Sequence, residues 1–412
     1  MKTSTSTYKA LKSGVIMISL LGRSLALAQE EPPHLPDSTD LRLNMDAVYN
    51  RPFLTEESFP VAIGGYLEAH GEYFVTEGIT EGLSFQIPRI TLFFSSTIKQ
   101  RIKFLSEIEF EEGTKEINIE FAAVDFEFHP LLNVRGGIIM NPIGAFNQNH
   151  DGPRWEFVER PISATTIIPA TFSNVGFGLH GKSYQHQWVW AYEAYVTNGF
   201  NEKIVANDMG RTWLPATKQN ADRFEENFNA IPLITLKTAL RHRQLGEIGV
   251  SWMGDVYNKY EEDGLVLDEK RSLNVVAIDV TSSVIEPLTI TGEWVWAFVD
   301  IPATYSQQFG SRQQGGFVDL VYTVFRKKIL GWDKASVQLA LRLEHVDYNV
   351  GTFAESGGKT HDDIQAIVPA ISFRPSSQTV IRANYRYTWE TDLLGNPSVR
   401  TAGFQLGISS YF

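Results

Sequence analysis

The chain contains no cysteine, which excludes a disulfide framework, a thiolate nucleophile and a cysteine-based zinc site. It also has no basic run, and its 36 Lys and Arg against 48 Asp and Glu give a formal net charge of −12. We therefore expect no binding to nucleic acid. The chain is too polar on average for a polytopic helical membrane protein. A transmembrane β-barrel stays possible, because only half of each of its strands is apolar.

Motifs of enzymes are missing too. The chain has no Gly-x-Ser-x-Gly elbow and no His-Glu-x-x-His pair, and its 9 histidines are scattered. His150-Asp151 with a nearby serine leaves a barrel-borne lipase as the enzymatic alternative, which replacement of that serine or histidine would test. We predict that the protein is not an enzyme and has neither a cofactor nor a metal site.

A large folded body is predicted by the apolar content, because 43% of the residues are hydrophobic and 12% aromatic. Before it, three lysines precede the apolar stretch 14–21, and Ala26-Leu27-Ala28 supplies a small-x-small cleavage site. Residues 1–28 are therefore predicted to be a secretory signal peptide. The alternative is a short anchor helix, but a run of about ten apolar residues is too short for a bilayer of about 30 Å.

The remaining chain divides into two parts. Residues 29–60 are Pro-rich and acidic at their start, and they are predicted to be a periplasmic lead-in, with insertion into a lumen as an alternative. Over 61–412 polar and apolar residues alternate: near the end, for example, Phe404 and Leu406 share one face while Gln405 lies on the other. Strands of this kind have one face suited to hydrocarbon and one suited to water.

Sixteen such strands can be placed between residues 61 and 412, and their connections alternate in length. Short turns on one side and long loops on the other are typical of a transmembrane antiparallel β-barrel with periplasmic turns and extracellular loops. A soluble two-sheet sandwich, the alternative, has no reason to segregate its loop lengths. The predicted long loops are 142–174, 200–230, 259–272, 302–314 and 349–362.

Four features predict interruptions of these strands. Pro88 and Pro369 lie inside strands and remove ladder donors, which predicts bulges or strand ends. The alternation also changes phase within 117–128 and within 273–284, which predicts a β-bulge in each.

The chain ends on Phe412 in an alternating strand. Bacterial outer-membrane proteins present such a strand to the barrel-assembly machinery, although an ordinary edge strand can also end in Phe. Aromatic residues near strand ends, such as Tyr387 and Trp389, fit the girdles that lie at the headgroup level. We predict a location in the bacterial outer membrane, in contact with its lipid and lipopolysaccharide.

Two parts of the chain resemble porins related to the phosphate-selective porins. The first is the run 135–151, followed by Glu159-Arg160-Pro161 and Ile168-Pro169-Ala170; it resembles a strand and the following loop. The second comprises 337–348, 371–375 and 382–385, which resemble that family's closing strands. The resemblance implies a sixteen-stranded homotrimeric porin whose long third loop, here 142–174, folds into the lumen. It does not establish phosphate selectivity, because this chain is acidic.

Five cations fall on the water-facing side of their strands. One hypothesis makes them a selectivity track that attracts small anions. The alternative, favoured by the excess of acidic residues, is that they pair with lumen carboxylates such as Glu107, Glu109, Glu293 and Glu344 and stiffen the wall. The five are Lys237, Arg241, Arg342, Arg382 and Arg386.

Loop 142–174 carries a mixed set of polar and charged side chains. Inside a lumen they would form a constriction that sets the size limit and the electric field. The alternative is a surface loop, shaped by its prolines, with solvated charges. The set is Asn147, His150, Asp151, Arg154, Trp155, Glu156 and Arg160.

The predicted function is that of an outer-membrane porin for passive diffusion of small hydrophilic solutes or ions, with an anion or phosphate preference left open. The alternative is a plugged structural or adhesion barrel that binds a partner through its extracellular loops. Whether 29–60 plugs the lumen and whether 142–174 lies inward or outward are questions that the sequence leaves open.

Overall fold

A computed structural model describes residues 44–45, 61–98 and 100–412. The predicted signal peptide, 1–28, lies outside these residues, as does most of the lead-in, 29–60. No helix in the described part of the chain is long and apolar enough to span a membrane.

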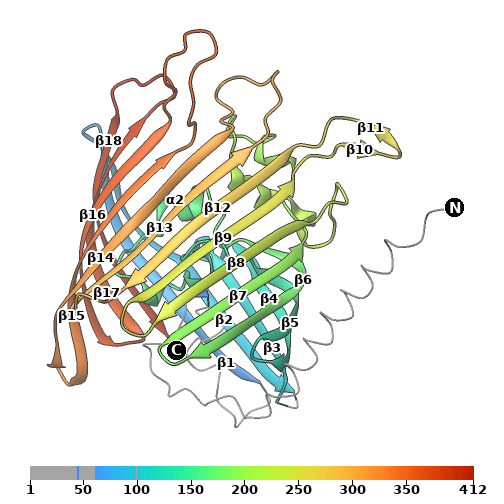
Figure 1. Ribbon diagram of the computed structural model, residues 1–412. Helices are drawn as coiled ribbons and strands as arrows, with labels where there is room; N and C mark the ends of the chain where they lie inside the picture. The colour runs from blue at the N-terminus through green and yellow to red at the C-terminus, as the bar shows by residue number, and fades with distance from the viewer. Residues whose placement is uncertain (1–43, 46–60, 99) are drawn as a thin grey trace. The chain divides into compact units, whose positions relative to one another are not determined.

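Sixteen strands of the described chain form one closed antiparallel barrel (Figure 1). Each strand pairs with its neighbours in sequence, and β1 closes the barrel on β18. A small hairpin, β10 (Glu261–Glu262) and β11 (Leu265–Val266), lies apart from the barrel in a loop. The barrel strands are β1 (Ala62–Thr76), β2 (Ile79–Ile98), β3 (Ile102–Glu111), β4 (Glu116–His129), β5 (Leu132–Met140), β6 (Ser173–Gln185), β7 (Trp188–Thr197), β8 (Leu233–His242), β9 (Gly246–Val256), β12 (Ser272–Ser282), β13 (Leu288–Val299), β14 (Arg312–Ile329), β15 (Trp332–Asp347), β16 (Asp363–Ser376), β17 (Thr379–Thr391) and β18 (Val399–Tyr411).

The two faces of the barrel wall follow the alternation in the sequence. On β18, Phe404 and Leu406 are 67% and 62% exposed on the outside, whereas Gln405 and Ser409 are buried inside. On β8, Leu236 faces outward and its neighbour Lys237 is buried inside. An apolar outer face without a sheet edge is what a spanning barrel requires, since hydrocarbon offers no partners to backbone groups.

The long connections all lie at one end of the barrel, together with two short ones, 77–78 and 112–115. The opposite end has tight turns such as 130–131, 186–187 and 330–331. The long loops include 141–172 and 198–232, which contain short helices. These are α2 (Ile162–Thr166) and the 3-10 turns η4 (Asn147–Asn149), η5 (Gly152–Arg154), η6 (Glu202–Ile204), η7 (Leu214–Gln219) and η8 (Ala221–Phe224). The third loop therefore begins and ends one or two residues before its predicted bounds of 142–174.

Two of the predicted strand interruptions are confirmed. The pairing of β1 with β2 shifts register opposite Pro88. The pairing of β3 with β4 shifts at Glu120, so that the consecutive side chains of Glu120 and Phe121 are both buried. A bulge re-aims a side chain in this way.

The other two predictions are wrong. Strand β16 runs through Pro369 without a register shift; the proline stays opposite Leu341, and the assigned pairs with β17 resume at Ala370. Strand β12 pairs continuously on both sides. Its two faces are both apolar, because Val275 and Ala277 are buried against loops while Ile278 faces outward. Apolar residues on both faces produced the pattern that a change of phase would give.

Candidate functional site

The third loop, residues 141–172, lies inside the barrel. Its backbone N–H groups at Ala145 and Phe146 donate to Glu293 of β13, at 2.7 and 3.1 Å. Farther along the loop, the N–H of Ile162 donates to Glu344 of β15 at 2.7 Å. Since these wall residues belong to different strands, the loop crosses the lumen and narrows it.

Close approach to the wall explains one glycine of this loop. Gly144 has a φ of 63°, where L side chains are strained, and a Cβ there would collide with the Glu293 carboxylate. Its N–H donates to Ser251 at 3.0 Å and its carbonyl accepts from Lys237. Only a glycine allows the loop to lie this close to β8, β9 and β13.

Asn147 holds the two ends of the loop together. Its side-chain amide donates to the carbonyls of Asn141 and Phe172 at 2.7 and 3.1 Å, and its oxygen accepts from the Phe172 N–H at 2.8 Å. Buried loop backbone needs such partners in place of water.

All five predicted lumen cations face inward, and each is in an ion pair. Arg342 is fully buried and meets Asp319, its direct cross-strand neighbour, with two hydrogen bonds of 2.7 Å. The other pairs are Lys237 with Asp279 (3.1 Å), Arg241 with Glu247 (3.4 Å), Arg382 with Glu68, and Arg386 with Glu344 (2.9 Å) and Glu159 (2.7 Å).

The partners differ from those proposed from the sequence, where only Glu344 was named among the six carboxylates that pair with these cations. Glu293 instead accepts from the loop backbone, and Glu109 lies 3.1 Å from Arg89. Glu107 contacts His150 of the loop. The alternation of side chains along a strand places a carboxylate on the inner face. Which cation that carboxylate pairs with depends on strand register and on the path of the loop.

Five of the six polar loop residues of the predicted constriction contact wall residues, whereas Asn147 bonds to the ends of the loop. Arg154 donates to Tyr411 at 3.2 Å, Glu156 pairs with Arg374 at 2.6 Å, and Arg160 lies 3.9 Å from Glu109. Their role in selectivity stays a prediction. Asn147, His150, Asp151 and Glu156 are buried, while Arg154 and Arg160 are partly exposed.

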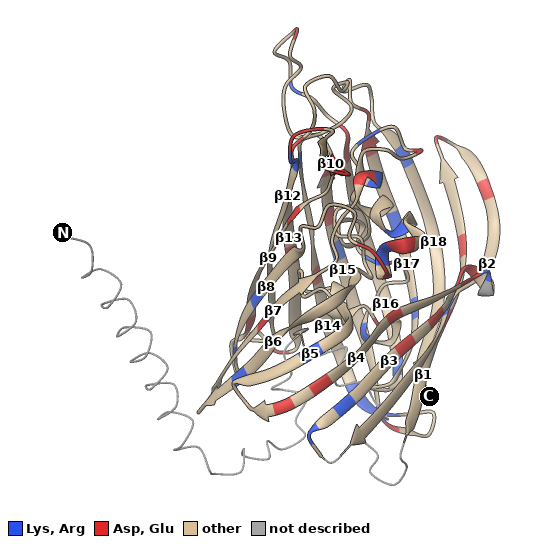
Figure 2. Cartoon of the chain, turned by 90° about the vertical axis from the view of Figure 1, so that its right-hand side faces the viewer, with Lys and Arg blue, Asp and Glu red and all other residues tan. Residues whose placement is uncertain are grey.

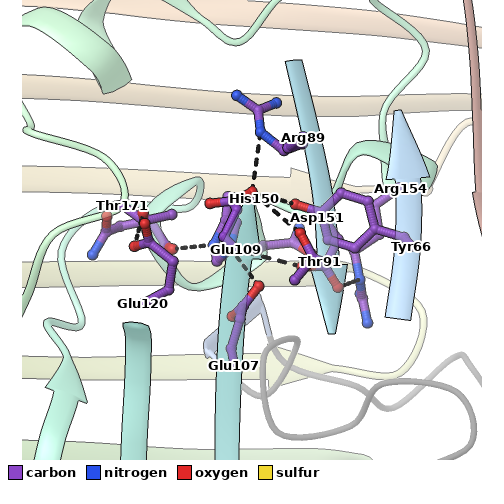
Figure 3. Close-up of polar contacts among 12 residues, drawn as sticks. Tyr66, Arg89, Thr91, Glu107, Glu109, Glu120, His150, Asp151, Arg154 and Thr171 are labelled. Carbon is purple, nitrogen blue, oxygen red and sulfur yellow. Dashed lines mark hydrogen bonds and ion pairs between the residues drawn. The ribbon is translucent and has the colours of Figure 1, made fainter. Parts of the chain in front are cut away.

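A group of acidic residues on β3 and β4 forms a polar centre around this loop (Figure 3). The Tyr66 hydroxyl and Arg89 both reach Glu109, and Thr171 of the loop donates to Glu120. Figure 2 shows these carboxylates as bands along the strands. Sequence reasoning did not single out Tyr66, Arg89 or Glu120, although period two places the first two on inner positions.

An apolar cluster holds the loop on the opposite side of the lumen. Ile167, Ile168 and Phe172 pack with Phe200 of the next loop. The inner faces of β12 and β13 contribute Val275, Ala277, Val295 and Ala297 to the same cluster.

A smaller contact and a cavity lie on the inner face nearer the short turns. Asn44 donates its N–H to both oxygens of Glu247 at 2.9 Å, and Met45 packs with Val189 and Ala191. Beside Met45 is a cavity of about 180 Å³ lined by side chains that include Asp125 and Arg135. Asn44 and Met45, which belong to the predicted lead-in, thus contact the inner wall.

No protein-family model matches the chain. An uncharacterized protein of Aquifex aeolicus is 34% identical over 146 residues, which are 34% of this chain and 32% of that protein. The match thus spans about a third of that relative's length.

Several solved structures share the fold. They include the outer-membrane channel DcaP of Acinetobacter baumannii (TM-score 0.53, 10% identity, 85% of this chain and 97% of that one). OprB of Pseudomonas putida matches with a TM-score of 0.52 and 9% identity, over 86% of this chain and 94% of that one. An anion-selective porin of Comamonas acidovorans matches with a TM-score of 0.51 and 10% identity, over 85% of this chain and 99% of that one. With a closed sixteen-stranded wall and an apolar outer face, this chain has the fold of the outer-membrane porins and is a β-barrel protein of the bacterial outer membrane.

Proposed function

We propose that this chain is a porin through which small hydrophilic solutes and ions diffuse passively. The observation that carries the proposal is a closed barrel with an apolar outside, a polar inner wall and one long loop, 141–172, hydrogen-bonded across the lumen. In such a pore the loop sets the size limit and the wall charges set the ion preference. Neither step requires a cofactor or an energy source.

A preference for anions or phosphate is the finer question, and we propose that any such preference is weak. Arg342, Arg382 and Arg386 each face carboxylates at ion-pair distance. A neutralised cation attracts a passing anion far less than an unpaired one does. The proposed membership of the phosphate-selective porin relatives therefore does not carry strong phosphate selectivity with it.

The proposal also covers assembly and surroundings. Strand β18 ends beside β1, where the N–H of Phe412 donates to the carbonyl of Gly65 at 3.0 Å. This supports recognition of the closing strand by the barrel-assembly machinery. Contact with lipopolysaccharide and assembly into a homotrimer complete the proposal.

The test is single-channel recording in a planar bilayer under a KCl gradient. We expect steady openings and a reversal potential near zero or on the cation side. A strongly anion-selective potential would restore the five cations as a selectivity track. Heat-modifiable migration on a gel, which reports the folded barrel, is the control for each preparation.

A second candidate is a plugged barrel, in which the same loop, attached to wall strands on several sides, closes the lumen. Folded protein that never conducts would contradict the porin proposal. Openings that appear only after Glu293→Ala, which removes the acceptor of two loop N–H groups, would then identify the loop as the plug.

A further inference from the structure

Three side chains capable of binding a metal ion meet inside the barrel (Figure 3). Glu107 comes from β3, and His150 and Asp151 come from the third loop. All three are buried, and one ligand atom from each lies within 4.8 Å of the others. The Nε2 atom of His150 is 3.6 Å from Oε1 of Glu107 and 3.8 Å from Oδ1 of Asp151.

A backbone carbonyl sets the orientation of the His150 imidazole. Its Nδ1 atom lies 2.8 Å from the carbonyl oxygen of Asn147. A carbonyl only accepts hydrogen bonds, so Nδ1 carries a proton and Nε2 is the ring nitrogen directed toward the two carboxylates. Metal-ligating histidines are held in this way, with the other ring N–H on a backbone carbonyl.

The distances fit ligands of one ion better than direct hydrogen bonds. Separations of 3.6 and 3.8 Å exceed the length of an N–H···O hydrogen bond. Two donors at about 2.0–2.1 Å from a tetrahedral zinc ion are about 3.4 Å apart. An imidazole nitrogen and two carboxylates in this arrangement suit a cation between them: a second ring proton or a metal ion.

The residues behind the three side chains are themselves held in place. The Tyr411 hydroxyl donates to Oδ2 of Asp151 at 2.6 Å, which leaves Oδ1 on the side of His150. Asn147, whose carbonyl orients the imidazole, is fixed by its bonds to Asn141 and Phe172. His150 and Asp151 are therefore preorganised by outer partners, as ligands are in known metal sites.

We propose that Glu107, His150 and Asp151 bind one divalent transition-metal ion, best represented by Zn²⁺, which joins the third loop to β3. One imidazole nitrogen and two carboxylate oxygens suit zinc, whereas Ca²⁺ and Mg²⁺ prefer oxygen donors alone. The proposed metal site does not depend on whether the barrel conducts ions. The prediction from sequence that there is no metal site arose because Glu107 lies far along the chain from His150-Asp151, and the three residues match no local motif.

The test uses the full-length, untagged protein in detergent at neutral pH after removal of metals with a chelator. Calorimetric titration with ZnCl₂ is expected to show one ion per chain. Replacing a ligand, in His150→Gln or Glu107→Gln, is expected to weaken binding more than 100-fold. Tyr411→Phe removes only an outer partner and is expected to weaken it about tenfold. His186→Gln, an exposed histidine, is the matched control and keeps full affinity.

Cobalt provides a second readout, since Co²⁺ in a site of low coordination number absorbs visible light. We expect these bands in the wild type and in His186→Gln, and their loss in His150→Gln. Zinc binding no tighter in the wild type than in His150→Gln would overturn the proposal and leave an imidazolium bridge. Heat-modifiable migration confirms folding, and Glu107→Gln, which preserves side-chain shape, decides the matter if His150→Gln fails to fold.

Discussion

The two sides of the lumen hold the third loop through different kinds of interaction. On the side of β8 to β13, Ile168 and Phe172 are buried among apolar residues from the wall and the next loop. On the side of β14 to β18 and β1, the loop meets charged residues such as Arg342, Arg382 and Glu68. Apolar burial has no preferred direction, whereas a buried ion pair depends on geometry and on both partners being present.

This difference indicates what each side contributes. The apolar side stabilises the inserted loop roughly in proportion to the area buried, and it tolerates changes that conserve volume. The charged side adds little net stability, because desolvation opposes attraction, but it specifies where each segment lies. Conservative substitutions on the two sides are therefore expected to behave differently.

The largest effect is expected on the charged side, for Arg342→Met. It leaves Asp319 buried without its cation, which costs about 3–5 kcal/mol for a broken buried pair. The measurement is the free energy of unfolding in urea, followed by tryptophan fluorescence in detergent micelles. The double variant Arg342→Met/Asp319→Leu is expected to recover most of the loss. Equal losses in the single and double variants would contradict this account.

Next in size is Ile168→Ala on the apolar side. Removing a fully buried isoleucine to alanine costs about 2–5 kcal/mol, because it leaves a cavity. The milder Ile168→Val is expected to cost only about 0.5–1.5 kcal/mol. Arg342→Lys, by contrast, is expected to lose most of the pairing, since lysine cannot make the bidentate contact. If both conservative variants cost the same, the two sides do not differ as proposed.

A smaller effect is expected for Glu293→Gln, at the border of the two sides. The carboxylate accepts from the N–H groups of Ala145 and Phe146, and hydrogen bonds to a charged group contribute about 1.5–3 kcal/mol. The amide oxygen retains a weaker acceptor, so we expect a loss of about 1 kcal/mol. The measurement is the unfolding free energy together with cleavage of the loop by added protease. Glu261→Gln, in the exposed hairpin, is the control.

The smallest effect is expected for a pair outside the barrel wall, between Arg271 and Asp268 at 2.9 Å in the loop 257–271. A hydrogen bond from Arg271 lowers the pKa of Asp268 below its ordinary value. The contribution of this carboxylate is therefore present above its unfolded pKa, about 3.9, and is lost as pH falls through the lower folded pKa. Because the side chain of Asp268 is 41% exposed, solvent screens the pair, and Arg271→Gln is expected to cost under about 1 kcal/mol.

Carbon NMR of labelled aspartate checks this last prediction directly. The pKa of Asp268 should rise in Arg271→Gln and in high salt, which screens exposed pairs. An unchanged pKa would show that another group is responsible. The contrast with Arg342 and Asp319 then measures what burial adds to the same kind of ion pair.

Much of the fold could be predicted because period two is a local property. The outward Phe404 and Leu406, the inward Lys237 and the bulge near Pro88 are confirmed. Strand β12 was misread because both of its faces are apolar, which local alternation cannot separate from a bulge.

The sequence by itself determined that this chain forms a barrel, since alternation assigns each side chain to lipid or lumen, and loop lengths assign the two ends. Only the tertiary structure decided which carboxylate meets which cation, that the third loop lies inside, and that Glu107 meets His150 and Asp151. The physical reason is distance along the chain. The alternation of polar and apolar residues depends only on neighbours in the sequence, whereas contacts across a lumen depend on register, closure and the path of a loop.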